Sequence, residues 1–140
     1  MKTLNNILLA LSATAVLGTT GLFAQNRAVA DIPFEFTVSN VSVPAGEYTL
    51  IEQSAQSDMI RIVNDETRKS VMVLALHTGT DHSKAATGKV IFHRYGDRYF
   101  LAGVWTPNGL DGRVPPSKEE RELKSEKEMA SISIPLAAAQ

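Results

Sequence analysis

The sequence predicts an all-β domain, an antiparallel sandwich or flattened barrel of about seven strands with one C-terminal α-helix. The strongest observation is the segment KVIFHRYGDRYFLAGVW at residues 89–105. Its two apolar, aromatic-rich runs flank Gly96-Asp97, a dipeptide that suits a two-residue hairpin turn. Short apolar runs separated by turn residues precede this hairpin, and a helix-start signal at Ser117 follows it. Sandwich and barrel both stay open, because closure depends on strand pairing.

The first 24 residues are expected to form a secretory signal peptide. Lys2 provides a short basic start, and residues 7–17 form an apolar core too short to span a bilayer. Cleavage is expected after Ala24, at the end of a small, polar stretch. We therefore expect one exported β-rich domain over residues 25–140, located in the periplasm or outside the cell.

Export can be checked on the mature protein. We expect mass spectrometry of the exported fraction to show a chain that begins at Gln25, because the small residue Ala24 suits the cleavage position. An exported chain that still carries Met1 would contradict this prediction.

Composition narrows the classes of partner. The chain has 14 basic and 15 acidic residues and a formal net charge of −1, and no basic stripe stands out. This argues against nucleic acid or an anionic membrane as the partner. No later apolar run approaches the length of a transmembrane helix. The chain has no cysteine, so the domain has to fold without disulfides.

The first half of the expected domain reads as a series of strands. Residues 25–30 look like a loose leader, and residues 31–39 alternate as a half-buried strand, with Pro33 suggesting an edge position. After a turn at residues 43–47, further strands are expected at residues 47–53 and 59–63. The nearly continuous apolar run at residues 70–77 predicts a strand buried on both faces.

The hairpin register follows from its turn. If Tyr95 and Arg98 close the turn, counting outward sets the cross-strand neighbours. The predicted pairs are His93 with Phe100, Phe92 with Leu101, Ile91 with Ala102, and Val90 with Gly103.

The C-terminal part predicts a helix after an irregular loop at residues 106–116. Ser117-Lys118-Glu119-Glu120 is a capping-box signature, in which Ser117 accepts from the Glu120 amide and the Glu120 side chain returns to the Ser117 amide. The helix is expected over residues 117–129, with Leu123 as its main apolar anchor. Residues 131–134 could then add a short edge strand, and residues 136–140 are expected to fray.

Several of these segments together resemble a known group of proteins. The segments are residues 32–36, 44–49, 89–97, 99–101 and 117–123. They resemble small exported proteins of unknown function that are common in acidobacterial genomes. The resemblance implies export and one compact domain. It implies no reaction, cofactor or catalytic residue.

Metal-dependent chemistry is a weak alternative. His77, Asp81 and His82 share one polar loop, and His93 could bring a third imidazole. Zinc catalysis usually needs three protein ligands of this kind around an open position. The spacing matches no established metal motif, so loop residues without a shared role are the preferred interpretation. A metal-dependent or hydrolase-like enzyme using the 77–82 loop stays open as the alternative function.

Other catalytic patterns are weaker still. The chain has no cysteine and no G-x-S-x-G motif. Acidic residues that could form a carboxylate pair fit solvent-facing strand or turn positions better; these are Glu35, Glu47, Glu52 and Asp58. We therefore predict no catalytic residue and no cofactor.

The aromatic and arginine residues around the hairpin are the best candidates for binding. Tyr95 and Tyr99 flank the turn, Trp105 leads into the 106–116 loop, and Arg113 lies in that loop. Such residue types are enriched where partners bind. The alternative is that the rings cover the core while the arginines stay solvated. The sequence thus predicts an exported, non-enzymatic domain with a binding or structural role at the cell envelope, its partner an unidentified protein or small molecule.

Overall fold

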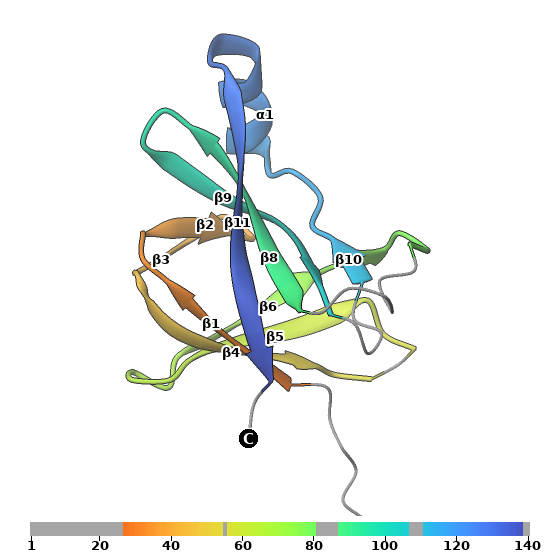
Figure 1. Ribbon diagram of the computed structural model, residues 1–140. Coiled ribbons are helices and arrows are strands. Elements are labelled where there is room, and N and C mark those ends of the chain that lie inside the picture. Colours follow the sequence, from red (N-terminus) through yellow and green to blue (C-terminus); the bar gives the residue numbers. More distant parts are fainter. Residues whose placement is uncertain (1–26, 55, 81–86, 107–110, 139–140) are drawn as a thin grey trace, which may run out of the picture.

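The part of the chain that the structure describes forms one strongly curled, mixed β-sheet with a single helix at one end (Figure 1). The computed structural model describes residues 27–54, 56–80, 87–106 and 111–138. Within these ranges the elements are β1 (Arg27–Ile32), β2 (Phe36–Val38), β3 (Val41–Val43), β4 (Gly46–Glu52), β5 (Met59–Asn64), β6 (Ser70–Leu74), β7 (Leu76–His77), β8 (Gly88–Tyr95), β9 (Arg98–Trp105), β10 (Asp111–Arg113), α1 (Lys118–Glu126) and β11 (Met129–Ala138).

The strand order explains the curled shape. The main path runs β3-β2-β9-β8-β11-β1-β4-β5-β6, and β10 pairs with both β9 and β7. Because β7 follows β6 after Ala75, β10 connects the far end of the sheet with β9. The result is an open sheet curved into a half-barrel.

The prediction of a strand-rich domain with one helix is confirmed, but its finer form is wrong. The described residues contain eleven strands in one sheet, where about seven in an antiparallel sandwich or barrel were expected. The sheet is also not wholly antiparallel, because β2 pairs in parallel with β9 at Thr37 and Phe100.

The concave face of the sheet holds the main core. The largest fully buried side chains on this face come from strands far apart in the sequence, among them Phe36, Tyr48, Leu50, Ile60 and Phe92. The Phe92 ring meets Phe34 and Phe36 edge-on, at centroid distances of 5.0 and 5.2 Å. This aromatic cluster packs the segment around β2 against the hairpin.

The hairpin turn is confirmed, and so are two of the four predicted pairs, His93 with Phe100 and Phe92 with Leu101. Gly96 has a φ of 65°, and the pairing follows the prediction from the turn as far as Phe92 with Leu101. A bulge then shifts the register, so Ile91 pairs with Gly103 and not with Ala102. Val90 correspondingly pairs with Val104. The extra residue on β9 is Ala102, an irregularity that simple counting from a turn does not include.

The N-terminal part differs from the prediction. The stretch expected to be a loose leader is mostly strand, because β1 begins at Arg27 and pairs with β4 over six residue pairs. Pro33 lies between β1 and β2, so residues 31–39 divide between two strands. Ala28 and Ala30 are buried on the same face as Ile32. Small alanines gave this strand too weak an apolar pattern for the sequence to show it.

The strand expected to be buried on both faces is present as β6 but is exposed on one. Met72 and Leu74 are each 43% exposed, whereas Val73 between them is buried. The prediction of two buried faces is wrong, because no second layer formed by the described residues covers these two side chains.

The C-terminal strand is longer and more central than predicted. β11 spans ten residues and lies between β8 and β1, where a short edge strand was expected. Pro135 is compatible with this place because pairing with β1 involves only Ala137 and Ala138, beyond the proline. Leu136 is buried and does not fray. The helix ends at Glu126, three residues earlier than expected.

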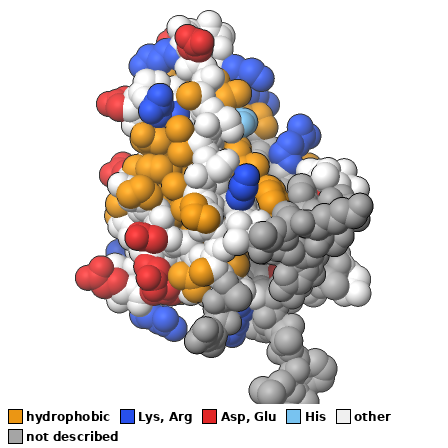
Figure 2. Space-filling model, in the orientation of Figure 1, with side chains coloured by type: hydrophobic (Ala, Val, Ile, Leu, Met, Phe, Trp, Pro, Cys, Tyr) orange, Lys and Arg blue, Asp and Glu red, His pale blue; other side chains and the backbone are white. Residues whose placement is uncertain are grey.

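Charged side chains of both signs surround a region of apolar side chains on the face shown in Figure 2. Asp and Glu side chains lie mostly along the left side of this region, and Lys and Arg side chains mostly above it and to its right. Among the residues that the structure describes, no helix has the length and apolar character needed to cross a membrane.

Candidate functional site

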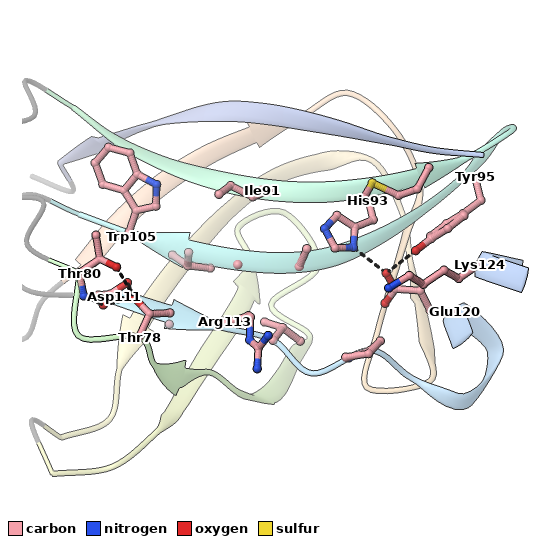
Figure 3. Close-up of a pocket in the computed structure, with 17 residues that line it drawn as sticks. Thr78, Thr80, Ile91, His93, Tyr95, Trp105, Asp111, Arg113, Glu120 and Lys124 are labelled. Carbon is pink, nitrogen blue, oxygen red and sulfur yellow. Dashed lines mark hydrogen bonds and ion pairs between the residues drawn. The ribbon is translucent and has the colours of Figure 1, made fainter. Parts of the chain in front are cut away.

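A groove of about 450 Å³ lies on the face of β8 and β9 that points away from the main core (Figure 3). Side chains alternate along a strand, so Ile91, His93 and Tyr95 face the groove while Val90 and Phe92 face the core. β10 borders the groove along one side, and α1 closes one end.

A buried carboxylate organises the end of the groove below the helix. Glu120 is only 3% exposed, and its Oε1 accepts a hydrogen bond of 3.1 Å from the Tyr95 hydroxyl. The same oxygen lies 2.8 Å from His93 Nδ1, which places the Nδ1 hydrogen between them when Glu120 is ionised. Burial, together with the negative charge of Glu120, raises the pKa of Tyr95 to about 12. Tyr95 is therefore a hydrogen-bond donor at neutral pH.

The predicted capping box is only half formed. The Ser117 hydroxyl accepts from the Glu120 amide at 3.2 Å, as expected. The Glu120 carboxylate instead reaches the sheet, where it bonds His93 and Tyr95. The side chain expected to cap the helix thus fastens α1 to the hairpin.

The contact between His93 and Glu120 has the geometry of a base with its orienting carboxylate. In catalytic triads, such a pair activates a hydroxyl nucleophile that is hydrogen-bonded to the second ring nitrogen. Among the described residues, no serine or threonine hydroxyl is hydrogen-bonded to His93. The pair therefore links helix and sheet without an adjacent side-chain nucleophile.

A second buried carboxylate organises the opposite end of the groove. Asp111 is 8% exposed and accepts hydrogen bonds from the Thr78 hydroxyl at 2.5 and 2.7 Å and from the Thr80 amide at 3.1 Å. Next to it, a Cβ on Gly112 would lie 2.6 Å from the Ala75 Cβ. Asp111 and Gly112 thus hold β10 tightly against the segment that contains β7.

The structure brings three of the four predicted binding residues to the groove. Trp105 and Arg113 line it, the first half-buried and the second exposed. Tyr95 also lines it but is buried and bonded to Glu120. Tyr99 lies elsewhere, with its ring stacked on Phe34 at a centroid distance of 3.8 Å.

The predicted metal loop is only partly within the described residues. Asp81 and His82 lie outside them. His77 is exposed, with its Nδ1 at 3.4 Å from a carboxylate oxygen of Asp58, and His93 contacts Glu120. In the part of the chain that the structure describes, no three His, Cys, Asp or Glu side chains gather closely enough to hold a metal ion.

Sequence reasoning missed three residues at the groove. Glu120 was expected only as a helix cap, Asp111 belonged to the expected irregular loop at residues 106–116, and Lys124 was one of the residues of the expected helix. A glutamate in the first helical turn and an aspartate before glycine are common in those local roles. No pattern in the sequence distinguishes them from acidic residues buried by tertiary packing.

Comparison of the chain with protein-family models, with curated proteins and with solved structures finds no match. The resemblance to small exported proteins therefore stays a prediction.

Proposed function

We propose that the chain is an exported, non-enzymatic domain that binds a ligand in the groove formed by β8, β9, β10 and α1. The observation that carries this proposal is the groove itself. Its volume of about 450 Å³ falls in the usual range of small-molecule sites. Its apolar lining includes Ile91 and Ala102, and the only tryptophan of the chain, Trp105, also lines it. A small molecule fits this shape better than a flat protein surface would.

Binding is favoured over catalysis by the state of the polar groups. Glu120 and Asp111 are buried and engaged in bonds that hold α1 and β10 in place. Both carboxylates thus have structural partners already. Export is supported by the apolar core at residues 7–17, and a location at the cell envelope follows from it.

A hydrolase-like enzyme is the second candidate, because of one observation. His93 Nδ1 lies 2.8 Å from Glu120, and His93 is about one-third exposed at the groove. Such a histidine could act as a base on a water molecule. This candidate predicts a rate with p-nitrophenyl acetate that the parent protein has and the His93→Gln variant lacks.

A neutral fluorescent probe tests the proposed site. N-phenyl-1-naphthylamine, which is uncharged and apolar, should bind the parent protein saturably with a stoichiometry of one. Ile91→Gln places an amide among the apolar groups of the groove and should weaken binding by about tenfold, because an amide is costly to desolvate. Met72→Gln is the matched control, since Met72 is exposed on β6 outside the groove.

Two outcomes would contradict the proposal. One is equal affinity in the parent and Ile91→Gln proteins, with loss of binding in Met72→Gln, which would place the probe on the exposed face of β6. The other is the histidine-dependent rate described above, which would favour the enzyme. Circular dichroism of each variant checks that the sheet is retained.

A further inference from the structure

We infer that the ligand is an amphipathic anion, with an apolar body in the groove and a carboxylate head held by Arg113. This inference rests on the proposed function and names the class of ligand for the same site. It follows from which charges in the groove are already neutralised and which are not.

The acidic side chains of the groove have their partners within the protein. Glu120 is bonded by His93 and Tyr95, and Asp111 by Thr78 and Thr80. Both carboxylates are buried. Neither presents an unpartnered negative charge to a ligand.

The basic side chains of the groove are in the opposite state. Arg113 and Lys124 are both exposed, and neither has an ion pair or hydrogen bond with another described residue. Lys89 does not line the groove but adds a third positive charge beside Trp105, with its Nζ 5.8 Å from the centre of the Trp105 ring. The charges available to a ligand are therefore positive, and an apolar ligand with a negative head would complement them.

Arg113 is the best placed of these cations. Arg113 pairs across the sheet with Gly103. Because Gly103 has no side chain, the space beside Arg113 on β9 is not filled by its cross-strand neighbour. Gly103 in turn pairs with Ile91, so the cation lies two strands from an apolar wall of the same groove. A guanidinium can bind a carboxylate through two parallel hydrogen bonds, which would fix the head while the body lies toward Ile91.

Three ligands with the same chain length separate charge from apolar contact. Decanoate, decan-1-ol and decyltrimethylammonium share a ten-carbon chain and differ in head charge. Their binding can be followed through the fluorescence of Trp105, the only tryptophan in the sequence, below the concentrations at which the two ions form micelles and below the solubility of decan-1-ol. We expect decanoate to bind about tenfold more tightly than decan-1-ol, and the cation most weakly.

Variants of the basic residues identify the head site. Arg113→Gln should remove most of the preference for decanoate and leave the affinity for decan-1-ol unchanged. Arg61→Gln is the matched control, because Arg61 is exposed on β5 and does not line the groove. Lys124→Gln should reduce the preference less than Arg113→Gln does.

The outcomes separate this inference from the proposed function. If decan-1-ol binds as tightly as decanoate, or if Arg113→Gln still binds decanoate more tightly than decan-1-ol, the groove binds ligands. The inference of a carboxylate head held by Arg113 is then wrong. If Arg61→Gln has the larger effect, the head lies at another site. If none of the three ligands nor the neutral probe binds, the proposed function itself fails.

Discussion

Replacing Phe92 by alanine is expected to lower the free energy of unfolding by about 3–5 kcal/mol. Phe92 is completely buried, and its ring meets Phe34 and Phe36 edge-on. Its removal would leave a cavity where the hairpin packs against β2, which pairs with β9 through only Thr37 and Phe100. A loss of this size is a large part of the stability of a typical domain, roughly 5–15 kcal/mol.

Urea unfolding followed by Trp105 fluorescence measures this effect. Met72→Ala is the control, because an exposed side chain on β6 should change stability by no more than about 0.5 kcal/mol. A Phe92→Ala protein with the same unfolding midpoint as the control would mean that the aromatic cluster is not part of the core.

Replacing Glu120 by alanine is expected to cost about 3 kcal/mol, because it leaves the buried Tyr95 hydroxyl without an acceptor and removes a hydrogen bond involving a charged group. Glu120 and Tyr95 are 3% and 1% exposed, so water cannot easily replace the lost partner. Glu119→Ala is a closely matched control. Glu119 precedes Glu120 on the same helix and pairs with Arg98 on the surface, where such a pair is worth about 0–1 kcal/mol.

A double-mutant cycle with Tyr95→Phe isolates the contact. If the hydroxyl and the carboxylate depend on each other, Glu120→Ala should cost less in the Tyr95→Phe protein than in the parent. Additive effects, or equal losses for Glu119→Ala and Glu120→Ala, would show that Glu120 is an ordinary surface cap.

The stability of the protein at alkaline pH tests the same contact, because Tyr95 ionises there. The pKa of Tyr95 is raised from 10.0 in an unfolded chain to about 12 in the fold, chiefly by burial. A raised pKa means that the contribution to stability is complete below pH 10 and is lost as the pH rises toward 12. The free energy of unfolding of the Tyr95→Phe protein should therefore depend less on pH over this range than that of the parent.

The contact also relates stability to the groove. Glu120 holds α1 against β8, and α1 closes one end of the groove and supplies Lys124. Glu120→Ala should therefore weaken the contacts of a ligand with Lys124 on α1 more than its contacts with Arg113, which lies on β10. The same buried carboxylate thus serves both the fold and the shape of the candidate site.

Local chemistry determined the features that the sequence predicted correctly. A glycine with positive φ suits the turn at Gly96, and a serine hydroxyl accepts from the third helical amide at Ser117. The alternating strands β4 and β5 likewise follow from neighbouring residues. Trp105 and Arg113 were chosen as binding candidates from residue type and from their position near the hairpin and the 106–116 loop. The structure places both at the groove, and their role in binding stays a prediction.

Only the tertiary structure decided the rest, because it depends on segments far apart in the chain. β11 is central because β8 and β1 pair on its two sides, which nothing in residues 129–138 specifies. Glu120 is buried because its helix packs on His93 and Tyr95, more than twenty residues earlier. Arg113 and Lys124 come to one groove through the pairing of β10 with β9 and the docking of α1. Periodicity and turn residues encode local conformation, whereas burial and long-range pairing arise only when distant surfaces meet.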